Sequence, residues 1–394
     1  MKRVVVFGAG SIGRGFVGAS FGAAGWGVTF VDVVESLVDR LNADGAYHQV
    51  VVSNEGETTI RVAPVDAVLL SDTDAVVASL VGADFGATAV GAANLPLVAS
   101  LISKGVSARL EANRGPLDVL LCENLHDAPQ VVRELISADS TTEVAKRVGL
   151  LATSIGRMVP VPVPDPADPT RVRVEPYSFL PFDASALLGA EPDVPDLVPI
   201  RDGFTLYGDR KLYVHNMGHC MLAYLGELRG YRYLWQAAED LELRYLARNA
   251  MVETAVALSV VHTVPVAPLL LHVDDLLKRF SNRALGDTVD RVGRDPQRKM
   301  QPDDRLLGSH LLCQRAGVKP IHVSVAVALG ARRLAAEDGL SRPLVEAHLL
   351  QHLFGGDEAE MAAVRLPLSP GATSVNVSAL VTQIDDLFSP SRII

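Results

Sequence analysis

Apolar and polar positions alternate along the first part of the chain in a way that predicts strands and helices in turn. Residues 3–7 form an apolar run of strand length, followed by a glycine-rich turn and by small and apolar residues that predict a helix ending near Gly25 or Gly27. A second apolar run at 28–33 predicts the next strand. Similar runs alternate with helical spacing up to about residue 160. This alternation is typical of a parallel, doubly wound sheet with helices on both faces.

The pattern changes at 160–169, where closely spaced prolines make continuous regular structure improbable. Beyond residue 200 the apolar positions recur every three to four residues, as they do in helices packed on one face. The segments with this spacing are 220–230, 233–262, 325–339 and 343–355. We therefore expect a Rossmann-type nucleotide-binding domain over 1–200 and a mostly α-helical domain over 201–394.

A glycine pattern in the first turn indicates a dinucleotide site. Gly8, Gly10 and Gly13 follow the first strand directly, and Asp32 stands at the end of the next strand, 24 residues after Gly8. Gly8 permits a tight turn, Gly10 lets backbone amides approach a diphosphate, and Gly13 lets helix and strand pack closely. The residues expected to bind the cofactor are Gly8, Ala9, Gly10, Ser11, Ile12, Gly13, Arg14 and Asp32. The alternative is a glycine turn without a nucleotide, and Arg14 could equally be a solvated residue of the first helical turn.

Asp32 also predicts which cofactor is preferred. A carboxylate at this position accepts hydrogen bonds from the adenosine ribose hydroxyls and repels a 2′-phosphate. The sequence therefore favours NAD over NADP.

Composition and charge narrow the class of protein further. Apolar residues make up 48% and charged residues 21%, which is typical of globular domains, and the net charge of −10 opposes binding to nucleic acid or to an anionic membrane surface. The uncharged stretch 85–103 contains glycines and a proline and too few large side chains for a membrane helix. Three widely spaced cysteines argue against a disulfide framework. We expect a soluble, cytoplasmic protein.

Three polar residues, Lys211, Asn216 and His219, interrupt an apolar run further along the chain, KLYVHNMGHC. In an α-helix, at ~100° per residue, Asn216 would lie about 140° and His219 about 80° from Lys211, so all three can face one site. A lysine whose pKa is lowered to about 7 or 8 can act as general base, and an asparagine amide can stabilise an alkoxide oxygen.

Two other interpretations of this segment stay open. Lys211 could be a solvated cap and His219 a core histidine. His215 and His219 are four residues apart, as two zinc ligands on one helical face would be, although no third ligand is evident nearby.

Four segments in the same order resemble the polyol-specific long-chain dehydrogenases, the mannitol dehydrogenase family. They are GAGSIGRGF near the amino end, LLCENL at 120–125, RKLYVHNMGH at 210–219 and DTVDRVGRDPQRKMQPDDRL at 287–306. The resemblance runs from residue 1 to about 335. It implies a metal-independent, NAD-dependent oxidoreductase whose catalysis takes place between a nucleotide-binding domain and a helical domain.

The resemblance also implies roles for single residues. The K-x4-N-x2-H pattern of the family falls on Lys211 as general base, Asn216 as oxyanion donor and His219 as an auxiliary polar group. A second oxyanion asparagine falls on Asn124. The phosphate-using branch implies mannitol 1-phosphate and fructose 6-phosphate as the reacting pair.

The basic segment 290–305 has two interpretations. Arg294 and Arg298 could bind the phosphate of a sugar alcohol, because guanidinium groups match phosphate oxygens. The acids interleaved with them also fit a solvated, salt-bridged loop.

Two departures from the family pattern, His215 and the segment 336–394, leave the substrate open. The alternatives are a free polyol 2-dehydrogenase, a hexuronate reductase of the same superfamily, and an NAD-binding regulatory protein with a degenerate site.

Overall fold

The computed structural model describes residues 1–125, 127–160, 165 and 167–338. The chain divides into two compact units, Met1–Gly208 and Asp209–Ile394. The helical spacing at 343–355 lies outside the described residues. Within the described residues, no helix is both long enough and apolar enough to cross a membrane.

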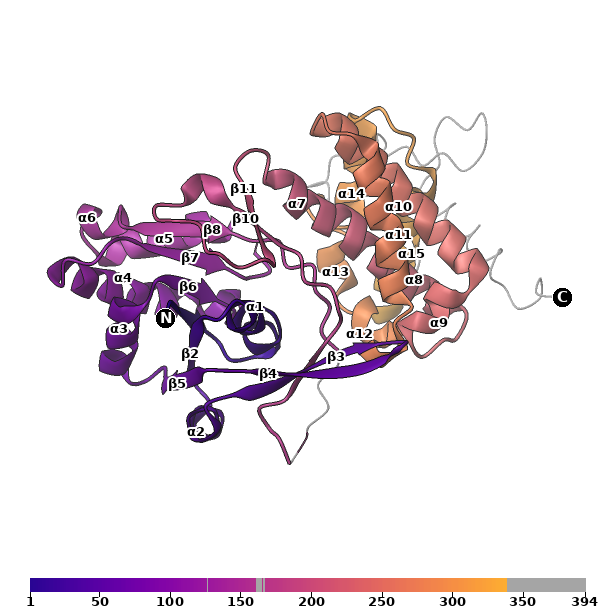
Figure 1. Ribbon diagram of the computed structural model, residues 1–394. Coiled ribbons are helices and arrows are strands. Elements are labelled where there is room, and N and C mark those ends of the chain that lie inside the picture. The colour runs from indigo at the N-terminus through magenta and orange to yellow at the C-terminus, as the bar shows by residue number, and fades with distance from the viewer. Residues whose placement is uncertain (126, 161–164, 166, 339–394) are drawn as a thin grey trace. The chain divides into compact units, whose positions relative to one another are not determined.

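The first unit is built on a six-stranded parallel sheet with the strand order β5-β2-β1-β6-β7-β8 (Figure 1). The strands are β1 (Arg3–Phe7), β2 (Gly27–Asp32), β5 (Val65–Leu69), β6 (Phe85–Thr88), β7 (Leu117–Leu121) and β8 (Val148–Ala152). This is the order of a doubly wound dinucleotide-binding sheet, and the order reverses between β1 and β6. The apolar runs are strands because both faces of the sheet are buried. The expected α/β fold is confirmed.

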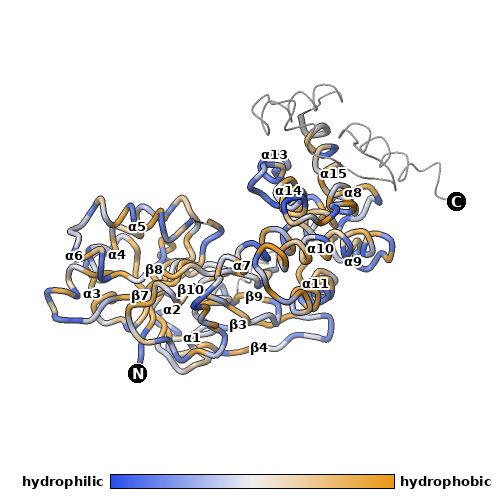
Figure 2. Tube along the Cα trace, turned by 90° about the horizontal axis from the view of Figure 1, so that it is seen from above, coloured by the Kyte–Doolittle hydropathy of each residue, from blue (hydrophilic) through white to orange (hydrophobic). Residues whose placement is uncertain are grey.

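Helices and 3₁₀ turns connect these strands. They are the π-helix η1 (Gly13–Gly18), α1 (Ala19–Ala23), α2 (Glu35–Asp44), α3 (Thr73–Gly82), η2 (Ala92–Asn94), α4 (Leu95–Glu111), α5 (Ala128–Asp139) and α6 (Thr142–Ala145). Two separate clusters of buried apolar side chains occupy the two sides of the sheet, one including Phe16 and Leu41 and the other Leu80 and Ile102. Figure 2 shows the hydrophobic colour along strands β7 and β8 of this sheet.

A smaller sheet of order β4-β3-β9 adjoins η1. Strands β3 (Tyr47–Ser53) and β4 (Gly56–Val62) form an antiparallel hairpin, and β9 (Val172–Val174) pairs with β3 in parallel. Gly15 allows β9 to lie close to η1, because a Cβ atom on Gly15 would be 2.7 Å from Val174 Cγ1. The short strands β10 (Leu180–Asp183) and β11 (Leu197–Ile200) form a third, parallel sheet, with η3 (Ala184–Ala186) between them in sequence.

In the second unit, the described residues form helices and no strand. They are the π-helix η4 (Arg210–Asn216), α8 (Met217–Leu228), α9 (Leu234–Glu239), α10 (Leu241–Val261), α11 (Val266–Phe280), η5 (Arg283–Leu285), α12 (Val289–Gly293), α13 (Pro296–Lys299), α14 (Leu307–Arg315) and α15 (Ile321–Asp338); α7 (Thr205–Asp209) leads into η4. The helical spacing at 233–262 corresponds to two helices, because Asp240 ends α9 and accepts hydrogen bonds from Glu242 N and Leu243 N as the N-cap of α10.

Candidate active site

The three glycines of the first turn do not all serve the same purpose. Gly8 has a φ of +91°, and a Cβ atom there would lie 2.4 Å from Ala89 O. A Cβ on Gly13 would lie 1.8 Å from Gly8 O, whereas a Cβ on Gly10 would meet nothing within 4 Å. Gly8 and Gly13 therefore serve the fold, and Gly10 leaves open space in front of the backbone. A dinucleotide diphosphate needs such space to approach the amides of the turn.

Asp32 supports the same turn. Its Oδ2 accepts a hydrogen bond of 2.7 Å from Ala9 N, and its Oδ1 accepts one of 3.0 Å from Val34 N. The carboxylate thus holds the glycine turn against the end of β2 in addition to facing a ribose. The sequence alone predicted only the role of facing a ribose.

Arg14 is half-buried, and its side chain contacts the turn itself. Nε donates to Ala9 O at 2.6 Å, and Nη1 donates to Thr170 O. Burial lowers the pKa of this guanidinium. Arg14 therefore ties the turn to Thr170, two residues before β9.

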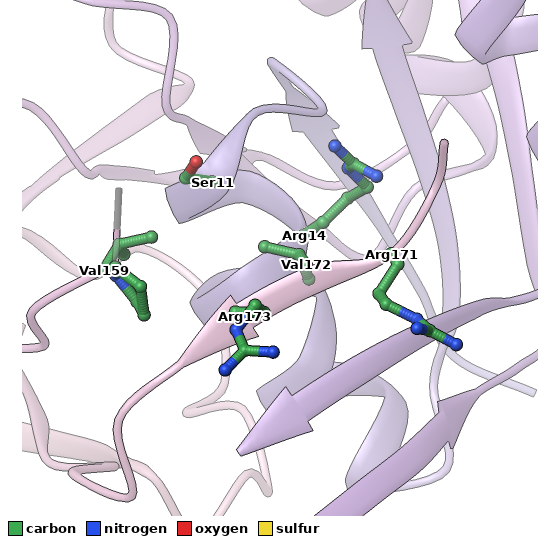
Figure 3. Close-up of a pocket in the computed structure, with 7 residues that line it drawn as sticks. Ser11, Arg14, Val159, Arg171, Val172 and Arg173 are labelled. Carbon is green, nitrogen blue, oxygen red and sulfur yellow. The ribbon is translucent and has the colours of Figure 1, made fainter. Parts of the chain in front are cut away.

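Beside the turn lies a cavity of about 90 Å³ (Figure 3). It is lined by Ser11, Arg14, Val159, Pro160, Arg171, Val172 and Arg173. Arg171 lies 2.9 Å from Asp165, and Arg173 forms an ion pair with Glu57. These two acidic side chains neutralise part of the positive charge of the arginines that line the cavity. The cavity could take a small anionic group next to the glycine turn.

The π-helical form of η1 is stabilised by side chains from outside the helix. The carbonyl of Gly15 accepts hydrogen bonds from Gln49 Nε2 and from Arg157 Nη1, each 2.8 Å long. Arg157 also lies over the Phe16 ring, 4.4 Å from its centroid. Within the first unit, Arg157 is thus a structural tie to the helix that follows the glycine turn. π-Helical turns are frequent at functional sites.

Asn124 lies just beyond the carboxyl end of β7. Phe7 pairs with Thr88 and Thr88 with Leu121, so the glycine turn after β1 and Asn124 after β7 share one edge of the sheet. The neighbouring Glu123 fixes the loop after β6 by accepting from Val90 N at 3.0 Å and from Gly91 N at 2.8 Å. Ligands of doubly wound sheets bind at this edge.

In the second unit, Lys211, Asn216 and His219 lie on one continuous helical segment, η4 followed by α8. In a π-helix the amide bonds to the carbonyl five residues earlier. Lys211 and Asn216 are five residues apart and so lie on the same side of successive turns. The angle of about 140° expected for an α-helix does not apply here, because the segment is π-helical.

The surroundings of Lys211 favour its neutral form, which a general base requires. Burial, and secondarily the positive charge of Arg305, lower its pKa to about 8. A lysine in this range is partly neutral near physiological pH and can accept a proton.

His219 and His215 pack together against Phe280. The two imidazole centroids are 6.1 Å apart, and that of His219 is 5.0 Å from the Phe280 ring. Burial lowers the pKa of His215 well below its ordinary value, with contributions from the charge of Arg279 and from His219. Among the described residues, no group of three or more histidine, cysteine or acidic side chains is arranged to hold a metal ion.

Arg294 and Arg298 form ion pairs. The Arg294 side chain is 70% exposed and lies 3.6 Å from Asp290. Arg298 contacts Asp295 at 2.6 Å and Asp304 at 2.8 Å. Both guanidinium groups can still reach solvent, so either can meet a phosphate in exchange for part of these pairs.

Sequence reasoning gave no role to Arg305 or to Asp287. Arg305 lowers the pKa of Lys211, and Asp287 lies 3.3 Å from His219. Both belong to the segment 287–306 that carries the family resemblance, which is the only signal that could have identified them.

Comparison with known proteins identifies the family over most of the chain. The Mannitol dehydrogenase Rossmann domain model matches residues 2–195, and the Mannitol dehydrogenase C-terminal domain model matches residues 204–364. The chain is 34% identical over 335 residues to mannitol-1-phosphate 5-dehydrogenase of Caldanaerobacter subterraneus subsp. tengcongensis, covering 84% of this chain and 86% of that protein. It is 33% identical to the enzyme of the same name from Bacillus licheniformis, covering 84% and 88%.

Among solved structures, Pseudomonas fluorescens mannitol 2-dehydrogenase in a ternary complex with NAD and D-mannitol superposes with a TM-score of 0.71. It is 17% identical, and the match covers 99% of this chain and 92% of that one. A D-sorbitol dehydrogenase superposes with a TM-score of 0.68 at 18% identity, covering 84% and 80%. At these identities the likeness concerns the fold.

Proposed function

The chain belongs to the mannitol dehydrogenase family, and on that premise we propose that it interconverts mannitol 1-phosphate and fructose 6-phosphate in an NAD-dependent reaction. The observation that carries this proposal is Lys211, a half-buried lysine whose pKa is lowered to about 8 and which lies on the same side of a π-helix as Asn216. The curated relatives named for this activity supply the substrate.

The residues of the first turn fit NAD. Gly10 leaves open space before the backbone, and Asp32 holds a negative charge at the end of β2. NAD, when bound, supplies the acceptor for the hydride that leaves the alcohol carbon. The start of the helix after the turn offers free amides for its diphosphate.

The chain's own residues then move the proton and hold the oxygen. Neutral Lys211 takes the proton of the substrate hydroxyl, because its lowered pKa keeps part of it unprotonated. The amide of Asn216 donates to the oxygen as it becomes a carbonyl, and the family resemblance implies the same role for Asn124. His219 orients the same hydroxyl. No metal ion is needed for these roles.

An activity screen tests the proposal. The purified chain, treated with a chelator, is assayed for NADH formation with mannitol 1-phosphate, mannitol and sorbitol, and for NADH consumption with fructose 6-phosphate and tagaturonate. We expect the phosphorylated pair to give the highest kcat/KM. Preference for free polyols or for tagaturonate would support the polyol 2-dehydrogenase or hexuronate alternatives, and NAD binding without turnover would support a regulatory protein.

We predict that Asp32→Asn relaxes cofactor choice. The asparagine oxygen can still accept from Ala9 N, so the contact with the glycine turn is retained, while the bond from Val34 N and the charge that repels a 2′-phosphate are lost. The ratio of kcat/KM for NAD to that for NADP should fall by about tenfold or more, equivalent to ~1.4 kcal/mol. Asp44→Asn, which removes an exposed acid paired with Arg40, is the matched control. A wild-type enzyme that is faster with NADP would contradict the assignment.

We also predict that Arg294 or Arg298 contributes to phosphate binding. Arg294→Ala or Arg298→Ala should raise the KM for mannitol 1-phosphate by roughly tenfold, the cost of a lost charge-assisted hydrogen bond. The KM for free mannitol should change little. Arg283→Ala, which breaks an exposed pair with Glu239, serves as control. Equal small effects on both substrates would make the segment a salt-bridged loop.

A further inference from the structure

Asp287 is a buried carboxylate held in a fixed place between η5 and α12. Its side chain is 9% exposed, and its backbone carbonyl accepts from Leu234 N at 2.9 Å. Oδ1 accepts from Arg291 Nε at 2.7 Å. Oδ2 lies 3.3 Å from Nε2 of His219 on α8. The two carboxylate oxygens therefore face two different basic side chains.

His219 needs such a neighbour. Its Nε2 is fully buried and has no well-directed hydrogen bond among the described residues, so the Asp287 carboxylate is the acceptor within reach. The imidazole lies against Phe280, with ring planes 31° apart, which limits its rotation. A buried polar nitrogen left without an acceptor is costly, and catalytic hydrogen bonds are often long until the substrate is bound. The contact at 3.3 Å fits a bond that tightens when the site is filled.

Asp287 stays ionised and can act as this acceptor. Burial by itself raises the pKa of the Asp287 carboxyl, but the interactions with His219 and with Arg291 outweigh it, and the pKa lies below its ordinary value. Arg291 alone does not explain the burial of the acid, because the Arg291 side chain is 46% exposed and reaches water.

We propose that Asp287 is a positioning residue of the active site. Its carboxylate keeps the proton of His219 on Nε2 and fixes the ring, so that Nδ1 is the acceptor offered to the substrate hydroxyl. Nδ1 is not among the enclosed nitrogens that lack a partner in the described residues. A carboxylate that orients a functional histidine through its other nitrogen is a recurrent arrangement. The inference rests on the proposed function for the role of His219.

The first test is a double-mutant cycle in the full-length enzyme. Asp287→Asn should lower kcat for polyol oxidation by about 10²-fold, as a misplaced catalytic group does, and leave the KM for NAD unchanged. In a His219→Ala background the same substitution should change kcat less than about twofold, because the group it positions is gone. An equal loss in both backgrounds would overturn the proposal. Asp274→Asn, which breaks an exposed pair with Arg248 in the same unit, should change nothing.

The second test does not need activity. In wild-type protein labelled with ¹⁵N at its histidines, NMR should show His219 with its proton on Nε2. The Asp287→Ala variant should give a mixture of the two His219 tautomers. An unchanged tautomer would overturn the proposal even in an active enzyme. If Asp287→Ala gives the mixture of His219 tautomers but the wild-type protein has no polyol activity, the positioning contact is supported and the proposed function is rejected. If Asp287 variants do not fold, Arg291→Gln retains the carboxylate and should shift the Nε2 resonance of His219, and no shift would overturn the proposal.

Discussion

Lys211→Met is expected to lower the turnover of polyol oxidation by about 10² to 10⁴-fold, the usual contribution of a positioned general base. The methionine fills a similar volume but cannot accept the proton of the substrate hydroxyl. NADH binding should be unchanged, because the glycine turn and Asp32 are untouched. The same variant should be more stable than the wild type at pH 7, since burial and Arg305 disfavour the charged lysine that must be accommodated there.

Steady-state kinetics in both directions, NADH titration and thermal unfolding measure these effects. Lys278→Met replaces an exposed lysine on α11 and is the matched control. A small amine added to Lys211→Met should restore part of the oxidation rate. If Lys211→Met kept wild-type turnover in both directions, Lys211 would be structural, and His219 would become the candidate base.

The pH dependence of the wild type has a definite sign. Oxidation needs the neutral lysine, so its rate should rise as pH increases through about 8, and reduction, which needs the protonated lysine, should fall over the same range. The pKa in the folded state lies below that of an unfolded lysine, about 10.4, so the unfolded chain binds more protons between these values. Loss of the Lys211 proton should therefore increase the free energy of unfolding as pH rises from about 8 to about 10.4. Lys211→Met should lose both the kinetic and the stability dependence.

Gly13→Ala is expected to lower the stability of the fold, and Gly10→Ala is expected to lower the affinity for NAD. The Cβ of Gly13→Ala would lie 1.8 Å from Gly8 O, and backbone cannot yield as a flexible side chain can, so we expect a loss of several kcal/mol in stability. The Cβ of Gly10→Ala would meet no protein atom within 4 Å, so the fold should retain its stability. It would fill the space that the diphosphate requires, and NAD affinity should fall by about 10²-fold, or ~2.7 kcal/mol.

Thermal unfolding and calorimetric titration with NAD separate the two effects. Gly82→Ala, at the end of α3, also meets nothing within 4 Å and should alter neither quantity. Normal NAD affinity in Gly10→Ala would contradict the assignment of the glycine turn as the cofactor site.

Local patterns in the sequence were sufficient to predict the parallel sheet and the protein family. The expected strand, the helix after the glycine turn and the following strand are β1, η1 with α1, and β2, and the helical spacing after Asp32 ends at Gly45, which caps α2 in a left-handed conformation with φ +59°. These features depend on residues close together in the chain, and the family and fold class are confirmed by comparison. The roles of the site residues remain predictions.

Features that depend on distant residues could not be predicted in this way. Strand β9 pairs Val172 with Gln49, and the Gly15 carbonyl in η1 accepts hydrogen bonds from Gln49 and Arg157, which lie far apart in sequence. The contact of Asp287 with His219 joins the segment before α12 to α8 and has no local signature. Sequence periodicity reports which face of an element is apolar, but not which side chain reaches it from elsewhere.

The π-helical turn at η4 has a consequence for insertions and deletions. Removing a single residue between Lys211 and Asn216 would return this turn to α-helical hydrogen bonding, and each residue of an α-helix corresponds to a rotation of about 100°. The lysine and the asparagine would then be four residues apart and would still lie within about 40° of each other around the helix axis. A related chain that is one residue shorter in this turn would therefore keep the spatial arrangement of the pair, while its sequence would no longer match the K-x4-N spacing of the motif.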